Sequence, residues 1–202
     1  SACRPHAWPC ITPPRRIGWG GSPDTLNPGA ATLEEAYTLF ELVYSSMYEL
    51  NLDGSYSPEL ATSVEVSDDG AVYTFKIRDD MRWHDGQPVT AQDVVFSYQF
   101  YQKHDDFPFM PAYTGSFDTI EAPDDQTVVL TLTEAIPNIE SQLFWLFILP
   151  EHIWAEYDTP EGAAAFENTA MIGSGPFKMR EYRQGEFVDL EAVKDHPVSP
   201  PK

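Results

Sequence analysis

The sequence predicts an α/β protein, because strand-like and helix-like hydrophobic patterns alternate along the chain. The stretch 58–98 shows both patterns most clearly. In one segment polar or smaller residues alternate with the larger apolar side chains of Tyr73, Phe75 and Ile77, which is the period of two of a strand with one buried face. Further on, apolar residues recur at the spacings of three and four that are typical of a helix, namely Ala91, Val94, Val95, Tyr98 and Tyr101.

Turn and capping signals divide this stretch into elements. Ser67–Gly70 contains the Asp and Gly residues that tolerate the positive φ of a tight hairpin turn. His84–Gly86 predicts a second turn. Thr90 then predicts a helix N-cap, with Asp93 in the first turn, where the helix dipole favours an anion. Lys103–Tyr113 has no periodicity, and we expect a surface loop there.

Before this stretch, the sequence predicts a strand at Arg16–Gly20, a loop at Ser22–Pro28 and a helix. Thr32–Glu35 fits a capping box, in which the Thr side chain reaches forward and the Glu side chain reaches back. The expected buried face of that helix consists of Leu33, Ala36, Tyr37, Phe40, Val43, Tyr44 and Met47.

After it, strand patterns predict a hairpin of Phe117–Ala122 with Thr127–Leu132 and another of Phe177–Tyr182 with Phe187–Ala192. Short helices are expected at Pro137–Phe144 and Pro160–Asn168.

Composition restricts the classes of function. With 202 residues and 42% hydrophobic content, the chain can bury one large core or two small ones. Its 12 basic and 32 acidic residues give a formal charge of -20, which repels nucleic acid phosphates. Nucleic acid is therefore not an expected partner. No apolar run reaches the roughly 18 residues that a membrane span needs.

The first 15 residues resemble a leader or linker, rich in proline and expected to be poorly ordered. Ser1–Cys3 is similar to the end of a bacterial lipoprotein signal, in which the cysteine carries the lipid, although an artefact of the sequence's start explains it equally well. Cys3, His6 and Cys10 lack the paired spacing of zinc ligands, so no metal is expected there.

Several motifs resemble one known family. Pro58–Ser63 reads PELATS, Tyr73–Asp79 reads YTFKIRD and Trp83–Ser97 reads WHDGQPVTAQDVVFS. Ile172–Met179 adds IGSGPFKM in the expected order. These phrases are similar to the signature regions of family 5 of the extracellular solute-binding proteins of ABC transporters, which includes oligopeptide, dipeptide and nickel receptors. The resemblance begins near Arg16 and runs to the end of the chain.

The resemblance implies a fold and an organisation. It implies a type II periplasmic-binding-protein lobe with a mixed sheet, flanking helices and a hairpin-rich subdomain. We expect residues 16–202 to form the N-terminal lobe, with 16–60 and 170–202 in the core sheet and 61–169 as the inserted subdomain. The family's second lobe is absent from this sequence, so we expect this chain alone to bind solute weakly or not at all.

The same resemblance implies a function. The expected role is the capture of a peptide outside the cytoplasm, in the periplasm or from a lipid anchor, and its delivery to an ABC permease, without a cofactor. A nickel-chelate or sugar receptor of the same fold is the alternative. The residues implied to contact the solute are Leu26, Asn27, Glu35, Tyr113 and Trp145. Two have structural alternatives, since Glu35 could be occupied by its capping box and Trp145 could lie in the core.

A secreted hydrolase is a more distant alternative, because no catalytic constellation stands out. Ser174 lies in Gly-Ser-Gly-Pro, which fits a turn entering a strand and not a nucleophile elbow. His84 and Asp85 could form half of an acid–base pair but occupy a predicted turn. We therefore expect no enzymatic activity.

Overall fold

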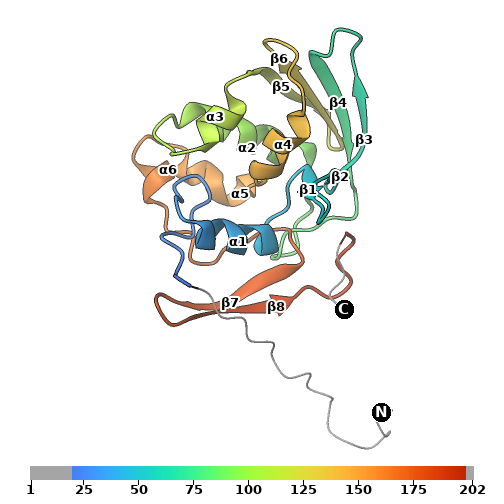
Figure 1. Ribbon diagram of the computed structural model, residues 1–202. Helices are drawn as coiled ribbons and strands as arrows, with labels where there is room; N and C mark the ends of the chain where they lie inside the picture. Colours follow the sequence, from blue (N-terminus) through green and yellow to red (C-terminus); the bar gives the residue numbers. More distant parts are fainter. Residues whose placement is uncertain (1–19, 199–202) are drawn as a thin grey trace, which may run out of the picture.

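The computed structural model describes residues 20–198 (Figure 1). The leader with Cys3, His6 and Cys10 lies outside the described residues, as does the strand expected at Arg16–Gly20 apart from Gly20 itself. No helix within residues 20–198 is long and apolar enough to cross a membrane. The division into a core sheet and an inserted subdomain stays a prediction.

The main sheet has four strands in the order β3-β4-β6-β5. It is built from two hairpins, β3 (Ala61–Val66) with β4 (Val72–Ile77) and β5 (Phe117–Asp124) with β6 (Thr127–Leu132), as the sequence predicts. Gly70 has a φ of 71° in the first turn, which explains the need for glycine there. The α/β class is thus confirmed, but the expected mixed sheet is not seen, since all pairings between described strands are antiparallel, both within the hairpins and between β4 and β6.

Helix α2 (Ala91–Lys103) packs against β5 and β6 and fills the centre of the molecule (Figure 1). Its predicted N-cap, Thr90, is confirmed, and Thr90 also forms a capping box with Asp93, since the Thr90 amide donates to Asp93 Oδ2 over 2.8 Å. All five apolar residues of the predicted helical pattern are buried. Asp93 also accepts the Glu151 amide through Oδ1, at 3.1 Å, which fixes helix α5 (Glu151–Trp154) at the start of α2.

The capping box predicted at Thr32–Glu35 is wrong, because helix α1 (Glu34–Val43) has no side-chain cap. Thr32 caps nothing, because its amide and hydroxyl both donate to Asp24 Oδ2, at 2.8 and 2.6 Å. The helix is also shorter than expected. Tertiary hydrogen bonds draw the following residues into an extended path, with the Ser46 hydroxyl donating to the Phe144 carbonyl. That path leads to the small hairpin of β1 (Tyr48–Leu50) and β2 (Tyr56–Pro58), which the sequence did not predict.

Three shorter elements refine the prediction. The expected loop 103–113 contains a helical turn, α3 (Met110–Thr114). Helix α4 (Ile139–Trp145) lies where a short helix was expected, and a 3-10 turn, η1 (Ala155–Tyr157), follows α5. The expected helix Pro160–Asn168 is reduced to α6 (Gly162–Ala165), because the backbone is already extended at Phe166, and Asn168 beyond it has a left-handed conformation with φ of 50°.

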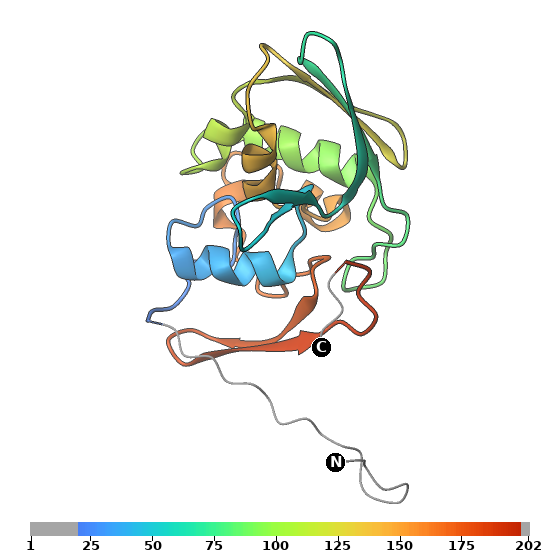
Figure 2. The same ribbon diagram turned by 45° about the vertical axis from the view of Figure 1, so that its right-hand side comes forward.

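The predicted final hairpin is present as β7 (Phe177–Arg183) and β8 (Phe187–Ala192). It lies beside α1, away from the four-stranded sheet (Figures 1 and 2). Gly173 and Gly175 precede it and pack directly on the end of α1, where an added Cβ at Gly173 would overlap the Val43 carbonyl oxygen. Close packing of backbone on backbone thus requires glycine at this point.

Candidate binding surface

An aromatic patch forms where three helices meet. It consists of Tyr37 from α1, Phe109 and Tyr113 at α3, and Phe144 and Trp145 from α4. The Tyr37 ring meets the Trp145 ring edge to face, with centroids 5.8 Å apart, and the Phe109 ring at 6.3 Å. The ring centroids of Phe144 and Trp145 lie 4.8 Å apart. Edge-to-face geometry is the preferred arrangement of aromatic rings, so the patch is a packed surface and not a loose collection.

The patch is buried enough to be ordered and exposed enough to be contacted. Tyr37, Tyr113 and Trp145 are each partly exposed, and 43% of Phe109 is accessible. Burial, together with the nearby Tyr113 hydroxyl and Asp24, raises the pKa of Tyr37, and burial with Tyr56 raises that of Tyr113. Both phenols therefore stay neutral across the physiological pH range. The Tyr37 hydroxyl donates to the Ala31 carbonyl at 3.2 Å, so towards a further partner it can act only as an acceptor.

The structure thus brings two of the five predicted contact residues, Tyr113 and Trp145, onto one surface. Trp145 lies neither fully in the core nor fully outside it, and Tyr113 lies in helix α3 and not in an irregular loop. Tyr37 was predicted only as part of the buried face of its helix. The local pattern around Glu34, Glu35 and Tyr37 predicts a helix but not a contact between the Tyr37 ring and Trp145. Tertiary packing alone brings these two residues together.

Leu26 and Asn27 form a buried corner instead of an open loop. The Asn27 amide donates to the Ala163 and Phe166 carbonyls, at 2.8 and 3.1 Å, and its oxygen accepts the Gly29 amide at 3.0 Å. The Leu26 carbonyl accepts the Asn168 amide at 2.7 Å. Both side chains are buried, so these groups hold the loop in place. Any contact that this corner makes with a solute would have to come from backbone atoms, and such a contact stays a prediction.

Glu35 is free of the capping box that could have occupied it. Its carboxylate is half-buried and lies against Gly21, where an added Cβ would overlap Oε1. Glu35 does not belong to the aromatic patch, although it sits on the same helix as Tyr37. Its predicted contact with a solute is not tested by this arrangement.

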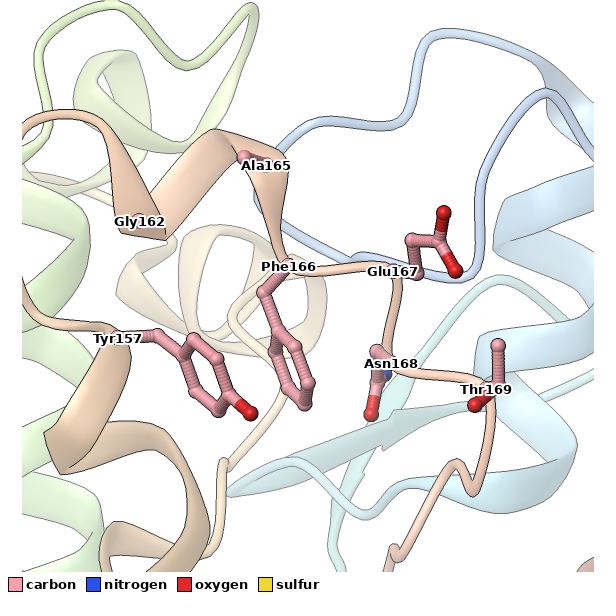
Figure 3. A pocket seen from close by; sticks show the side chains of 7 residues that line it. All are labelled: Tyr157, Gly162, Ala165, Phe166, Glu167, Asn168 and Thr169. Atoms are coloured by element: carbon pink, nitrogen blue, oxygen red, sulfur yellow. The ribbon is translucent and has the colours of Figure 1, made fainter.

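Two pockets lie next to these residues. The larger, of about 450 Å³, is lined by the segment from Tyr157 to Thr169 (Figure 3). Its main apolar feature is the Tyr157–Phe166 pair, stacked with centroids 3.8 Å apart and planes inclined by 10°. Figure 3 shows the Glu167 carboxylate directed away from these rings. The pocket therefore combines an aromatic wall with no opposing charged group.

The smaller pocket, of about 170 Å³, contains three carboxylates, those of Glu41, Glu49 and Glu59. Burial and the nearby charge of Glu49 raise the pKa of Glu59 to about 7, although the Ser46 amide donates to its Oε2 over 2.9 Å and opposes that shift. Burial also raises the pKa of Glu41. Within residues 20–198 no Lys or Arg pairs with any of the three carboxylates.

The acid–base pair considered for His84 and Asp85 does not form. Asp85 pairs with His152 instead, at 2.7 Å, and hydrogen bonds from His152 and the Gln87 amide lower the pKa of Asp85 although partial burial opposes them. The His84 ring nitrogens instead form hydrogen bonds with backbone atoms of Gly173 and Gly175. Ser174 is buried. Among residues 20–198 no three His, Cys, Asp or Glu side chains are grouped so that they could hold a metal ion.

The sequence of this chain is similar to a known protein family and to individual proteins. Residues 55–202 match the sequence profile described as bacterial extracellular solute-binding proteins, family 5 Middle. A Brucella ovis protein named as an ABC transporter peptide-binding protein is 35% identical over 186 residues, which cover 89% of this chain and 34% of that protein.

Two solved structures have the same fold. NikZ from Campylobacter jejuni, in complex with Ni(L-His), is 26% identical, with a TM-score of 0.78 over 88% of this chain and 35% of NikZ. The oligopeptide-binding protein AppA from Bacillus subtilis, in complex with a nonapeptide, is 26% identical, with a TM-score of 0.76 over 87% and 35% of the two chains. The chain spans about a third of the length of these relatives. With a type II periplasmic-binding-protein fold and a profile match over most of its length, the chain belongs to the family 5 extracellular solute-binding proteins.

Proposed function

We propose that this chain is the first part of a receptor that captures short peptides outside the cytoplasm and delivers them to an ABC permease. The observation that carries the proposal is the aromatic patch, in which the Tyr37 and Trp145 rings meet and the Tyr113 hydroxyl lies near that of Tyr37. The names of the Brucella protein and of AppA support a peptide over other solutes. Because the chain spans a third of such relatives, the proposal concerns a receptor of their full length.

The chemistry of the patch suits a peptide. Aromatic side chains offer large apolar area at a low cost in conformational entropy, and tyrosine hydroxyls can also bond to peptide amides. Solute sites are mostly apolar with a few oriented polar groups, which is the composition found here. In the proposed receptor a second lobe closes over this surface, so that the solute is buried and the closed form is recognised by the permease.

The five predicted residues take different parts in this proposal. Tyr113 and Trp145 supply ring surface, and Leu26 and Asn27 shape the corner whose backbone faces the solute. Glu35 would attract a cationic group at the solute's edge. Anchoring of the receptor through a lipid on Cys3 is part of the same hypothesis.

A nickel chelate is the second candidate solute, because NikZ in complex with Ni(L-His) superposes on this chain with a TM-score of 0.78. A solute pocket combines aromatic lining with a few polar groups, and such a lining can surround a small chelate as well as a peptide side chain. The two candidates differ in the charge and length of the ligand. They can therefore be separated by direct titration.

The test is calorimetric titration of the longest gene product that contains this sequence. We expect tripeptides to nonapeptides to bind, and Tyr113→Ala or Trp145→Ala to weaken binding about 5- to 30-fold, as for truncated aromatic contacts at interfaces. Phe187→Ala, an exposed aromatic on β8, is the matched control and should leave affinity unchanged. Binding of Ni(L-His) with no binding of peptides would replace the first candidate by the second.

A further inference from the structure

The segment Gly173–Gly175 connects two parts of the molecule. It runs from the helical region into β7 and packs on the end of α1, where the Gly175 amide donates to the Val43 carbonyl at 2.8 Å. On its other side the segment meets the turn at His84, whose amide donates to the Gly173 carbonyl at 2.8 Å. The position of the β7–β8 hairpin therefore depends on how firmly this segment is held.

The imidazole of His84 holds the segment with both of its nitrogens. Nε2 lies 3.0 Å from the Gly175 carbonyl oxygen, and Nδ1 lies 3.3 Å from the Gly173 amide nitrogen. A carbonyl can only accept and an amide N–H can only donate, so the proton must be on Nε2 and Nδ1 must carry a lone pair. Only the neutral ring, in this one tautomer, satisfies both partners.

Protonation would convert one of these bonds into a repulsive contact. The imidazolium has a proton on each nitrogen, and its Nδ1–H would point at the Gly173 N–H. The Gly175 bond would remain. Loss of one bond and gain of a donor–donor clash would loosen the segment at Gly173, while the backbone bond from the His84 amide would keep it from leaving altogether.

The surroundings of His84 favour the neutral ring. Burial lowers its pKa, and the nearby His196 and Lys178 act in the same direction, whereas the Gly175 carbonyl and Asp85 oppose them. Asp85 is itself bonded to His152. Glu41 and Glu59 share a small pocket with Pro176, the residue after this segment. Glu49 lines the same pocket, and Arg78 and Asp80 lie near His196, which bonds to Ser174 in the segment.

His196 provides an internal contrast. Its Nε2 lies 2.9 Å from the Ser174 carbonyl oxygen. This bond needs only a proton on Nε2, and both the neutral tautomer and the imidazolium have one. Two histidines thus hold neighbouring residues of the same segment. The bonds to the Ser174 and Gly175 carbonyls are compatible with protonation, whereas the bond between His84 Nδ1 and the Gly173 amide is not.

We propose that His84 is a proton-operated latch, which in its neutral form fixes Gly173–Gly175 and the β7–β8 hairpin to the rest of the chain and which loosens them when the pH falls. The latch is a property of this chain and does not depend on the solute of the proposed receptor. A receptor working outside the cytoplasm meets changes of pH directly, so the latch would make the hairpin's attachment sensitive to acid.

The test is nuclear magnetic resonance of the ¹⁵N-labelled 202-residue chain between pH 4.5 and 8. Long-range ¹H–¹⁵N spectra report the tautomer and titration of the His84 ring, and amide exchange, divided by the intrinsic rate at each pH, reports the protection of Gly173 and of β7. We expect the Nε2–H tautomer near neutral pH. Protection of the Gly173 amide should fall about tenfold or more over the same pH range in which the ring titrates.

His84→Gln should show the low protection already at pH 7.5, whereas His152→Gln, which removes a histidine from the neighbouring Asp85 pair, should behave as the wild type does. Glu59→Gln removes the other nearby titration and should leave the pH of loosening unchanged. An Nδ1–H tautomer, or protection that stays constant while the His84 ring titrates, would overturn the proposal. If His84→Gln does not fold, the wild-type titration alone still decides.

Discussion

The four-stranded sheet and the β7–β8 hairpin are built from similar sequences but are stabilised in different ways. In β6, Val128, Leu130 and Leu132 are all buried beneath α2. In β7 and β8 no residue is fully buried. A two-stranded hairpin has little stability of its own, so β7 and β8 depend on α1 and on the Gly173–Gly175 segment. The sheet carries its own core, and the hairpin depends on its attachment.

The largest difference should come from the same substitution made in both regions. Phe75→Ala removes a buried ring from β4, and we expect a loss of about 3–5 kcal/mol in the free energy of unfolding. Phe187→Ala removes a ring of which 42% is exposed on β8, and we expect a loss below about 1 kcal/mol. Denaturant unfolding of both variants measures this contrast. Equal losses would show that the hairpin has a core of its own.

The attachment itself can be broken at Gly173. Gly173→Ala forces a methyl group against the Val43 carbonyl, and overpacking of this kind costs about 1–3 kcal/mol. The loss should be accompanied by faster amide exchange in β7 and β8 while α2 stays protected. Gly20→Ala is the matched control, since nothing lies within 4 Å of an added Cβ there. Uniform loosening of the whole chain would contradict a docked hairpin.

The pocket next to Pro176 predicts a pH effect of opposite sign to that of His84. The pKa of Glu59 is raised from 4.5 to about 7, so the folded state binds more protons than the unfolded state between these values. This group's contribution to stability is therefore complete below pH 4.5 and is lost as the pH rises to about 7, with a slope of at most about 1.4 kcal/mol per pH unit.

Glu59→Gln keeps the shape of the protonated acid and should be more stable than the wild type above pH 7 but not below pH 4.5. The difference between the two proteins, followed by thermal unfolding against pH, isolates Glu59 from His84 and His196, whose lowered pKa values remove stability below about pH 6.5. Glu121→Gln, on the exposed side of β5, should show no such difference. If the wild type is as stable as Glu59→Gln at pH 8, ionised Glu59 does not destabilise the fold, and the prediction is wrong.

Local sequence patterns correctly predicted the hairpins, which are stabilised by contacts between residues close together in the sequence. The three larger hairpins follow from alternation and turn residues, and Gly70 and Gly185 have the positive φ that their turns require. The errors occur where tertiary contacts compete with local preference. α1 ends at Val43 because Ser46 bonds to Phe144, and the helix after Pro160 stops at Ala165, where the Asn27 side chain bonds to the Ala163 and Phe166 carbonyls.

The candidate site was less predictable for the same reason. A resemblance can mark Tyr113 and Trp145 as positions along the chain, but only packing of α1 on α4 brings Tyr37 to them. Asn27 shows the opposite case. Its side-chain amide was expected to contact the solute, but it donates to the carbonyls of Ala163 and Phe166, which lie 136 and 139 residues further on.

The smallest predicted effect is a difference between the N-terminus of α2, which packs on the four-stranded sheet, and the N-terminus of α1, which packs on the β7–β8 hairpin. Thr90→Ala removes the capping box of α2, and we expect a loss of about 1 kcal/mol in the free energy of unfolding. Thr32→Ala removes an exposed bond to Asp24 ahead of α1, which has no capping box, so its loss should stay within about 0.5 kcal/mol. Denaturant unfolding of the two variants separates these values. A larger loss at Thr32 would mean that its bond to Asp24 fixes the loop on which α1 begins, and would make the attachment of the hairpin, through α1, depend on the chain before it.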